Sequence, residues 1–174
     1  NETVELTISE EIAQPTITVP AGKTLNLTLN GGTIKNVAGK ETLVNNGTMT
    51  ISGTGTIDNT EVNKAALTNN GTLTILGGTI SRSQDTGVPD DDTHPGYYTL
   101  VNHGTMIIGA EGADNSGITI SSTGGYSALV ENGWYDSTGK EAGTDDCYLT
   151  IYGGTFTGGK YCVKNDELGN TTIK

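Results

Sequence analysis

The chain has few aromatic residues, few basic residues and no long apolar run. Aromatic residues make up 5% of its 174 residues, and nine lysines and arginines face twenty aspartates and glutamates, for a formal net charge of −11. This balance argues against nucleic acid as a partner, because phosphate binding requires a basic surface. No apolar run approaches the ~18 residues of a membrane-spanning helix, so we expect no insertion into a membrane.

Glycine, threonine and asparagine are abundant instead, and they occur in a phrase that returns along the chain. Its copies are Leu43-Val44-Asn45-Asn46-Gly47-Thr48, Leu67-Thr68-Asn69-Asn70-Gly71-Thr72, Leu100-Val101-Asn102-His103-Gly104-Thr105 and Leu129-Val130-Glu131-Asn132-Gly133. Most copies are followed by a short alternating apolar segment and a phrase such as Gly77-Gly78-Thr79-Ile80. Such self-similarity predicts a solenoid, in which a repeat buries its apolar face only against its neighbours.

The spacing of the phrase predicts the length of one coil. Gly47 and Gly71 are 24 residues apart, Gly71 and Gly104 are 33 apart, and Gly104 and Gly133 are 29 apart. A basic coil of about 24 residues with insertions accounts for these spacings, so we expect an all-β solenoid of roughly six coils. Alternation with period 2 in Leu73-Thr74-Ile75 places both apolar residues inward.

Asparagine tolerates the corners between strands and can bond to its stacked neighbour. We therefore expect one column of stacked side chains, made of Asn46, Asn70, His103, Asn132 and Asn165.

The two cysteines are too few for a disulfide framework. Cys162 falls at the repeat position of Leu43 and Leu67, so we expect it to point into the core as a small hydrophobe. Cys147 aligns with the turn glycines Gly47 and Gly71. Whether the two thiols pair is left open. Two histidines without a Cys-x-x-Cys pair argue against a zinc site.

The segment 17–27, the following Thr28-Leu29-Asn30-Gly31-Gly32-Thr33-Ile34 and the Asn-Asn-Gly-Thr-Leu-Thr-Ile phrases resemble the coils of right-handed parallel β-helix, pectin-lyase-like surface proteins. The resemblance covers nearly the whole chain. It implies a secreted or wall-attached protein of Gram-positive or gut bacteria, often adhesin-like. It also implies a single domain that belongs to a larger surface protein, with residues 1–20 as an N-terminal cap and first strands and 21–174 as coils.

Function on a solenoid concentrates in loops that break the period. Three insertions do so, at 81–98, 109–117 and 133–147, and every tyrosine, tryptophan and phenylalanine lies at or beyond position 97. Aromatic rings stack on sugar rings while carboxylates accept bonds from hydroxyls. The residues expected to bind a ligand are Tyr97, Tyr98, Trp134, Tyr135 and Asp136.

An acidic run in the first insertion is a candidate calcium site. Asp90, Asp91 and Asp92 lie on one loop, and Ca²⁺ takes several carboxylate and carbonyl oxygens. The alternative is a solvated acidic turn after Pro89. We expect no other cofactor and no catalytic residue.

Three functions remain open at this stage. The first is an extracellular, adhesin-like module that binds a glycan or a host surface protein through the inserted loops. The second is a carbohydrate-active enzyme, which would need paired carboxylates on one face; the net charge of −11 would repel an anionic polysaccharide. The third is a stalk segment that binds nothing and makes end-to-end contact with neighbouring domains. We favour the first.

Overall fold

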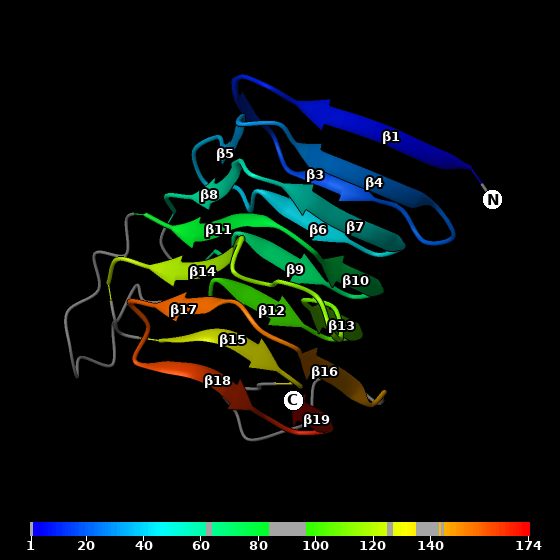
Figure 1. Cartoon of the computed structure of the whole chain (residues 1–174), viewed down its shortest axis with the longest axis vertical. Helices are drawn as coiled ribbons and strands as arrows, with labels where there is room; N and C mark the ends of the chain where they lie inside the picture. Colours follow the sequence, from blue (N-terminus) through cyan, green and yellow to red (C-terminus); the bar gives the residue numbers. More distant parts are fainter. Residues whose placement is uncertain (1, 62–63, 84–96, 125–126, 135–142, 144) are drawn as a thin grey trace.

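The chain winds as a parallel β-helix, with three strands in each turn and six turns stacked along one axis (Figure 1). This computed structural model describes residues 2–61, 64–83, 97–124, 127–134, 143 and 145–174. Each strand pairs in parallel with the equivalent strand of the next turn, which builds three sheets. The expected all-β solenoid of about six coils is confirmed. No helix among the described residues is long and apolar enough to cross a membrane.

The three sheets are named here by the order in which a turn visits them. Sheet A contains β1 (Thr3–Ile8), β4 (Thr24–Leu29), β7 (Thr48–Gly53), β10 (Thr72–Ile75), β13 (Thr105–Ile108), β16 (Cys147–Ile151) and β19 (Gly169–Ile173). Sheet B contains β2 (Glu11–Gln14), β5 (Thr33–Asn36), β8 (Thr56–Asn59), β11 (Gly78–Arg82), β14 (Ile118–Ser122) and β17 (Thr155–Thr157). Sheet C contains β3 (Ile17–Val19), β6 (Leu43–Asn45), β9 (Leu67–Asn69), β12 (Leu100–Asn102), β15 (Ala128–Asn132) and β18 (Tyr161–Asn165).

The core consists of stacked apolar columns, because alternate side chains of a strand point to opposite faces of its sheet. In sheet A, Leu73 and Ile75 are fully buried, as the alternation predicts, while Thr74 between them faces outward. The column of Ile75 runs from Leu6 on β1 to Ile173 on β19 without a polar residue.

The polar ladder inside the helix differs from the expected one. The inner column is made of Asn45, Asn69, Asn102 and Asn132, which are fully buried, and of Asn165, which is exposed in the last turn; each side-chain amide donates to the next carbonyl oxygen at 2.7–2.9 Å. The second asparagine of each phrase lies one residue further, outside the core. There, Asn70 donates to Asn46 at 2.8 Å and faces His103 Nδ1 at 3.2 Å. One predicted column is therefore two separate ladders.

Gly104 and Gly133 do not occupy equivalent positions, contrary to the expected spacing. The register pairs Val130, not Leu129, with Leu100, and the residue equivalent to Gly104 is Cys147, next to the pair Thr105 and Tyr148. The same shift of one residue makes Val163, not Cys162, continue the leucine column. Cys162 is consequently exposed rather than a core residue, Cys147 is buried at the predicted glycine position, and both thiols are free.

The glycine of the repeated phrase is required by close approach of the backbone. A Cβ atom on Gly104 would lie 2.2 Å from the carbonyl oxygen of Gly71, and one on Gly71 would lie 2.1 Å from that of Gly47. Left-handed glycines occur at the other corner, between sheets A and B, where Gly53 and Gly78 have φ of 92° and 88°. A Cβ atom on Gly53 would also lie 2.2 Å from the carbonyl oxygen of Leu29, so this corner needs glycine both for its backbone conformation and for close approach.

Candidate functional site

The base of the first insertion is closed by the only arginine of the chain. Arg82 ends β11, is fully buried, and donates from Nη1 to the carbonyl oxygen of Tyr97 at 2.7 Å and from Nη2 to that of Glu61 at 2.9 Å. The guanidinium therefore joins the end of β11, where the insertion starts, to Tyr97 near its end. A guanidinium group suits this task, because its several N–H donors can bind carbonyl groups of two segments at once.

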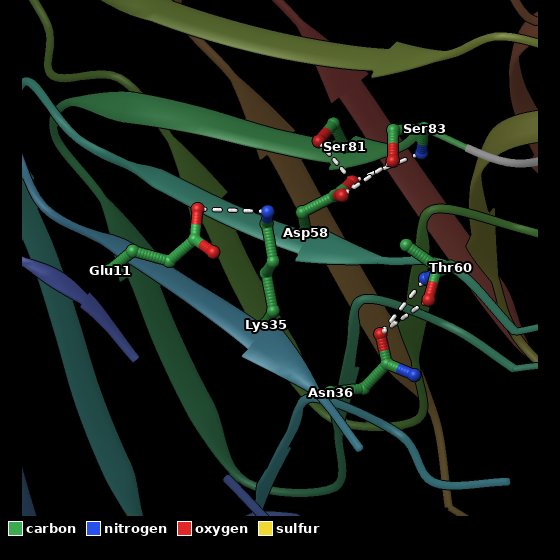
Figure 2. Close-up of polar contacts among 7 residues, drawn as sticks. All are labelled: Glu11, Lys35, Asn36, Asp58, Thr60, Ser81 and Ser83. Carbon is green, nitrogen blue, oxygen red and sulfur yellow. Dashed lines mark hydrogen bonds and ion pairs between the residues drawn. The ribbon is translucent and has the colours of Figure 1, made fainter. Parts of the chain in front are cut away.

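A buried carboxylate anchors the start of the same insertion. Asp58 on β8 accepts hydrogen bonds from the hydroxyl of Ser81 at 2.6 Å and from the amide and hydroxyl of Ser83, both at the start of the insertion (Figure 2). Its neighbour on the outer face of sheet B, Lys35, pairs with Glu11 at 2.8 Å. With three donors on one carboxylate, Asp58 is satisfied although only 5% exposed. The start of the first insertion is therefore held against sheet B.

Tyr97 and Tyr98 end the insertion and lead into a group of polar side chains on the outer face of sheet C. Their ring centroids are 5.4 Å apart, and Lys164 Nζ lies 3.3 Å from the hydroxyl of Tyr98. Lys164 also pairs with Asp166 at 3.0 Å, and it is the register partner of Glu131. We call Tyr97, Tyr98, Glu131, Lys164 and Asp166 the tyrosine–carboxyl cluster.

Glu131 is the most buried acid of the tyrosine–carboxyl cluster. It is 3% exposed, and its Oε1 has no hydrogen-bond partner among the described residues. Burial, followed by the neighbouring Asp166 carboxyl, raises the pKa of Glu131 to about 8, against the opposing effect of Lys164. The side chain is therefore mostly protonated at neutral pH and can donate a hydrogen bond.

The surroundings of the cluster also shift the pKa values of Tyr98 and Lys164. Burial, with a contribution from Glu131, raises the pKa of Tyr98 to about 12, so its hydroxyl stays protonated. Burial lowers the pKa of Lys164, but the bonds to Asp166 and Tyr98 outweigh it, and the net shift is upward. At neutral pH the cluster therefore presents an ammonium group, a phenol and a protonated carboxyl side by side.

The third insertion is closed in a similar way by Trp134. Its indole stacks on the ring of His103, with centroids 4.1 Å apart and planes at 5°, and its Nε1 donates to the carbonyl oxygen of Asp145 at 3.0 Å. Trp134 and Asp145 lie on either side of residues 135–144, most of which are outside the described part of the chain. Burial lowers the pKa of His103, so the stacked imidazole is neutral at pH 7.

The structure brings the ends of the first and third insertions to one short segment of the last turn. Tyr98 contacts Lys164, and the backbone of Trp134 pairs with Glu167, three residues further along, through an amide-to-carbonyl bond of 2.9 Å. Two of the predicted binding regions therefore border residues 164–167. The second insertion lies elsewhere, where Asn115 bonds to Ala110 and to the carbonyl oxygen of Tyr152.

Several predicted site residues lie outside the described part of the chain. These are Asp90, Asp91, Asp92, Tyr135 and Asp136. Within the described residues, no group of three or more histidines, cysteines, aspartates and glutamates could hold a metal ion.

Sequence reasoning missed Glu131, Lys164, Asp166 and Arg82. One signal was available for Glu131, since it replaces an apolar or threonine residue at the outward position of the phrase, where Val44, Thr68 and Val101 stand in earlier turns. No comparable pattern marks Lys164 or Asp166, because only the stacking of the last turn places them beside Tyr98.

Comparison with known protein-family models, with curated proteins and with solved structures finds no match to this chain. The assignment of a parallel β-helix therefore rests on the strand topology of the chain itself.

Replacing Arg82 with methionine tests the closure of the first insertion. The variant keeps the volume of the side chain but leaves the carbonyl groups of Tyr97 and Glu61 without their donor. We expect the free energy of unfolding to fall by about 2 kcal/mol, the scale for buried carbonyl groups that lose a partner. Chemical denaturation measures it, with Lys40→Met on an exposed turn as the matched control. Equal stability of both variants would contradict the anchoring role.

Proposed function

We propose that this chain is an extracellular, adhesin-like binding module that recognises a neutral glycan at the tyrosine–carboxyl cluster. The observation that carries the proposal is the meeting of Tyr98, at the end of the first insertion, with Lys164 and Asp166 on the last turn. Tyr97 and Tyr98 are two of the five residues that sequence analysis expects to bind a ligand; the others, Trp134, Tyr135 and Asp136, belong to the third insertion.

The chemistry of the cluster suits a sugar. A pyranose offers an apolar C–H face and a ring of hydroxyls, and sites for it combine aromatic rings with a few fixed polar groups. Tyr97 and Tyr98 supply two half-buried rings at a tilt of 59°. Lys164 supplies donors and Asp166 supplies acceptors, already oriented by their mutual pair. The net charge of −11 disfavours an anionic polymer.

A glycan array with the whole chain tests the proposal. For any neutral glycan that binds, we expect Tyr98→Ala to weaken binding about tenfold, since aromatic contacts contribute about 1.4 kcal/mol, and Lys164→Met to weaken it as well. The matched control is Tyr161→Ala, which removes a tyrosine that is 61% exposed and outside the cluster. Binding that survives the cluster variants, or no binding by a folded chain, would overturn the proposal; the second result favours a stalk.

One observation favours a second candidate, a carbohydrate-active enzyme. Glycoside hydrolysis uses a protonated and an ionised carboxyl group, and Glu131 beside Asp166 provides an acid whose pKa is raised to about 8. The exposure of only 3% at Glu131 argues for the binding role, because a general acid must reach the glycosidic oxygen. Release of reducing ends from a bound glycan, abolished in both Glu131→Gln and Asp166→Asn, would establish the enzyme instead.

A further inference from the structure

Two carboxyl groups and one ammonium group meet between β15 and the end of β18. Glu131 and Lys164 are register partners on the two strands, and Lys164 Nζ lies 3.0 Å from Asp166 Oδ2. The backbone amide of Asp166 donates to the carbonyl oxygen of Asn132 at 2.8 Å, which holds Asp166 next to the strand that carries Glu131. Within the tyrosine–carboxyl cluster, one ammonium group is therefore shared by two carboxyl groups.

Burial makes it costly for both carboxyl groups to be ionised at once. Glu131 is 3% exposed, and the side chain of Asp166 is 16% exposed. A buried carboxylate needs an opposite charge or hydrogen-bond donors, and Lys164 already pairs with Asp166. Glu131 therefore keeps its proton at neutral pH and donates it in a hydrogen bond to the carboxylate of Asp166.

We infer that Glu131 is a positioning residue, whose proton keeps Asp166 and Lys164 in place beside Tyr98. While Glu131 donates to Asp166, that carboxylate faces Lys164. The ammonium group then lies 3.3 Å from the hydroxyl of Tyr98 and 5.8 Å from its ring centroid. Once Glu131 is ionised, its carboxylate repels Asp166 and attracts its register partner Lys164, which leaves the Tyr98 ring. The ligand affected by this change is the neutral glycan, so this part of the inference rests on the proposed function.

The pH range of the change follows from the groups that face Glu131. These groups come from the segment before β12 and from the end of β18, and they are Tyr97, Tyr98, Lys164 and Asp166, with Glu41 and Arg82 acting further away on Tyr97. Burial and the Asp166 carboxyl raise the pKa of Glu131 to about 8. Burial raises the pKa values of both tyrosines from 10.0, and the net shift of the Lys164 pKa from 10.5 is also upward. Glu131 therefore loses its proton between pH 7 and pH 9, while the phenols and the ammonium group keep theirs.

Nuclear magnetic resonance of the whole chain without any ligand tests the positioning role. We expect a nuclear Overhauser contact between the Lys164 side chain and the Tyr98 ring at pH 7 and its loss at pH 9. Glu131→Gln should keep the contact at both pH values, because a glutamine amide donates to Asp166 whatever the pH. The matched control, Glu111→Gln at an exposed residue of the second insertion, should lose it at pH 9 as the original chain does. The same result at both pH values in the original chain, or a loss that Glu131→Gln shares, would overturn the inference.

The affinity for the strongest neutral glycan from the array gives a second readout. About nine in ten molecules have an ionised Glu131 at pH 9, so we expect binding to be about tenfold weaker there than at pH 7. This drop should be absent in Glu131→Gln and retained in Glu111→Gln. An equal drop in both variants would overturn the inference. If no neutral glycan binds the folded chain, the proposed function fails, and the contact between Lys164 and Tyr98 alone decides whether Glu131 positions its neighbours.

Discussion

Asn102→Asp is expected to lower the free energy of unfolding by about 4 kcal/mol. The amide of Asn102 donates to Asn132 Oδ1 at 2.7 Å and to the carbonyl oxygens of Gly104 and Tyr148, both at 3.1 Å. Aspartate has the same shape but no amide donors, so an oxygen would face these three acceptors in a fully buried site. Losing buried donors costs 1–3 kcal/mol each, and burying an unpaired charge costs more.

The outer ladder supplies the matched control for this variant. Asn70→Asp makes the same chemical change one residue outside the core, where the side chain is exposed and bonds only to Asn46 and His103. We expect its effect to stay within about 0.5 kcal/mol, as for most surface substitutions. Urea denaturation at pH 7 measures both variants. Similar losses for the two would show that the buried asparagine ladder does not hold the turns together.

Glu131→Gln is expected to stabilise the protein at neutral pH. A carboxyl group whose pKa is raised from 4.5 to about 8 binds more protons in the folded state than in the unfolded state between these pH values. Stability contributed by this group therefore falls as the pH rises from 4.5 towards 8. The unfolding free energy of the original chain, relative to that of Glu131→Gln, should drop by about 3 kcal/mol between pH 4.5 and pH 7.

Denaturation of both proteins at several pH values checks this prediction. Groups facing Glu131 also titrate or carry charge, namely Asp166, Lys164 and the two tyrosines of the cluster. Glu111→Gln is the matched control, because it makes the same chemical change at an exposed residue of the second insertion, outside the cluster. A constant difference between the original chain and Glu131→Gln from pH 4.5 to 7 would contradict a buried, protonated Glu131.

The repeat made the architecture predictable, whereas the exact register was not. Where the phrase is intact, short strands with alternating apolar residues and a recurring Asn-Gly-Thr corner can stack in only one register. The fourth copy carries Glu131 and runs into the third insertion, so Leu129 could be aligned with Leu100 as easily as Val130 could. That ambiguity of one residue produced the errors for Cys162 and for the asparagine column.

The candidate site was predictable only in part, for a related reason. Tyr98 could be singled out because it ends an insertion that breaks the repeat. Lys164 is 66 residues away in sequence, and its contact with Tyr98 arises only because β18 is stacked two strands beyond β12, with β15 between them. Arg82 likewise looks like an isolated basic residue in the sequence, and its role appears only when Tyr97 is placed above it.

The most direct test of glycan recognition at the tyrosine–carboxyl cluster is a titration of the tyrosine-labelled chain followed by nuclear magnetic resonance. The seven tyrosines are distributed over the C-terminal half, so they report the position of a bound sugar. With the strongest neutral glycan from the array, we predict saturable shifts at Tyr97 and Tyr98 and none at the exposed Tyr148 and Tyr161. Shifts confined to Tyr148 or Tyr161 would place recognition elsewhere and contradict the proposed site.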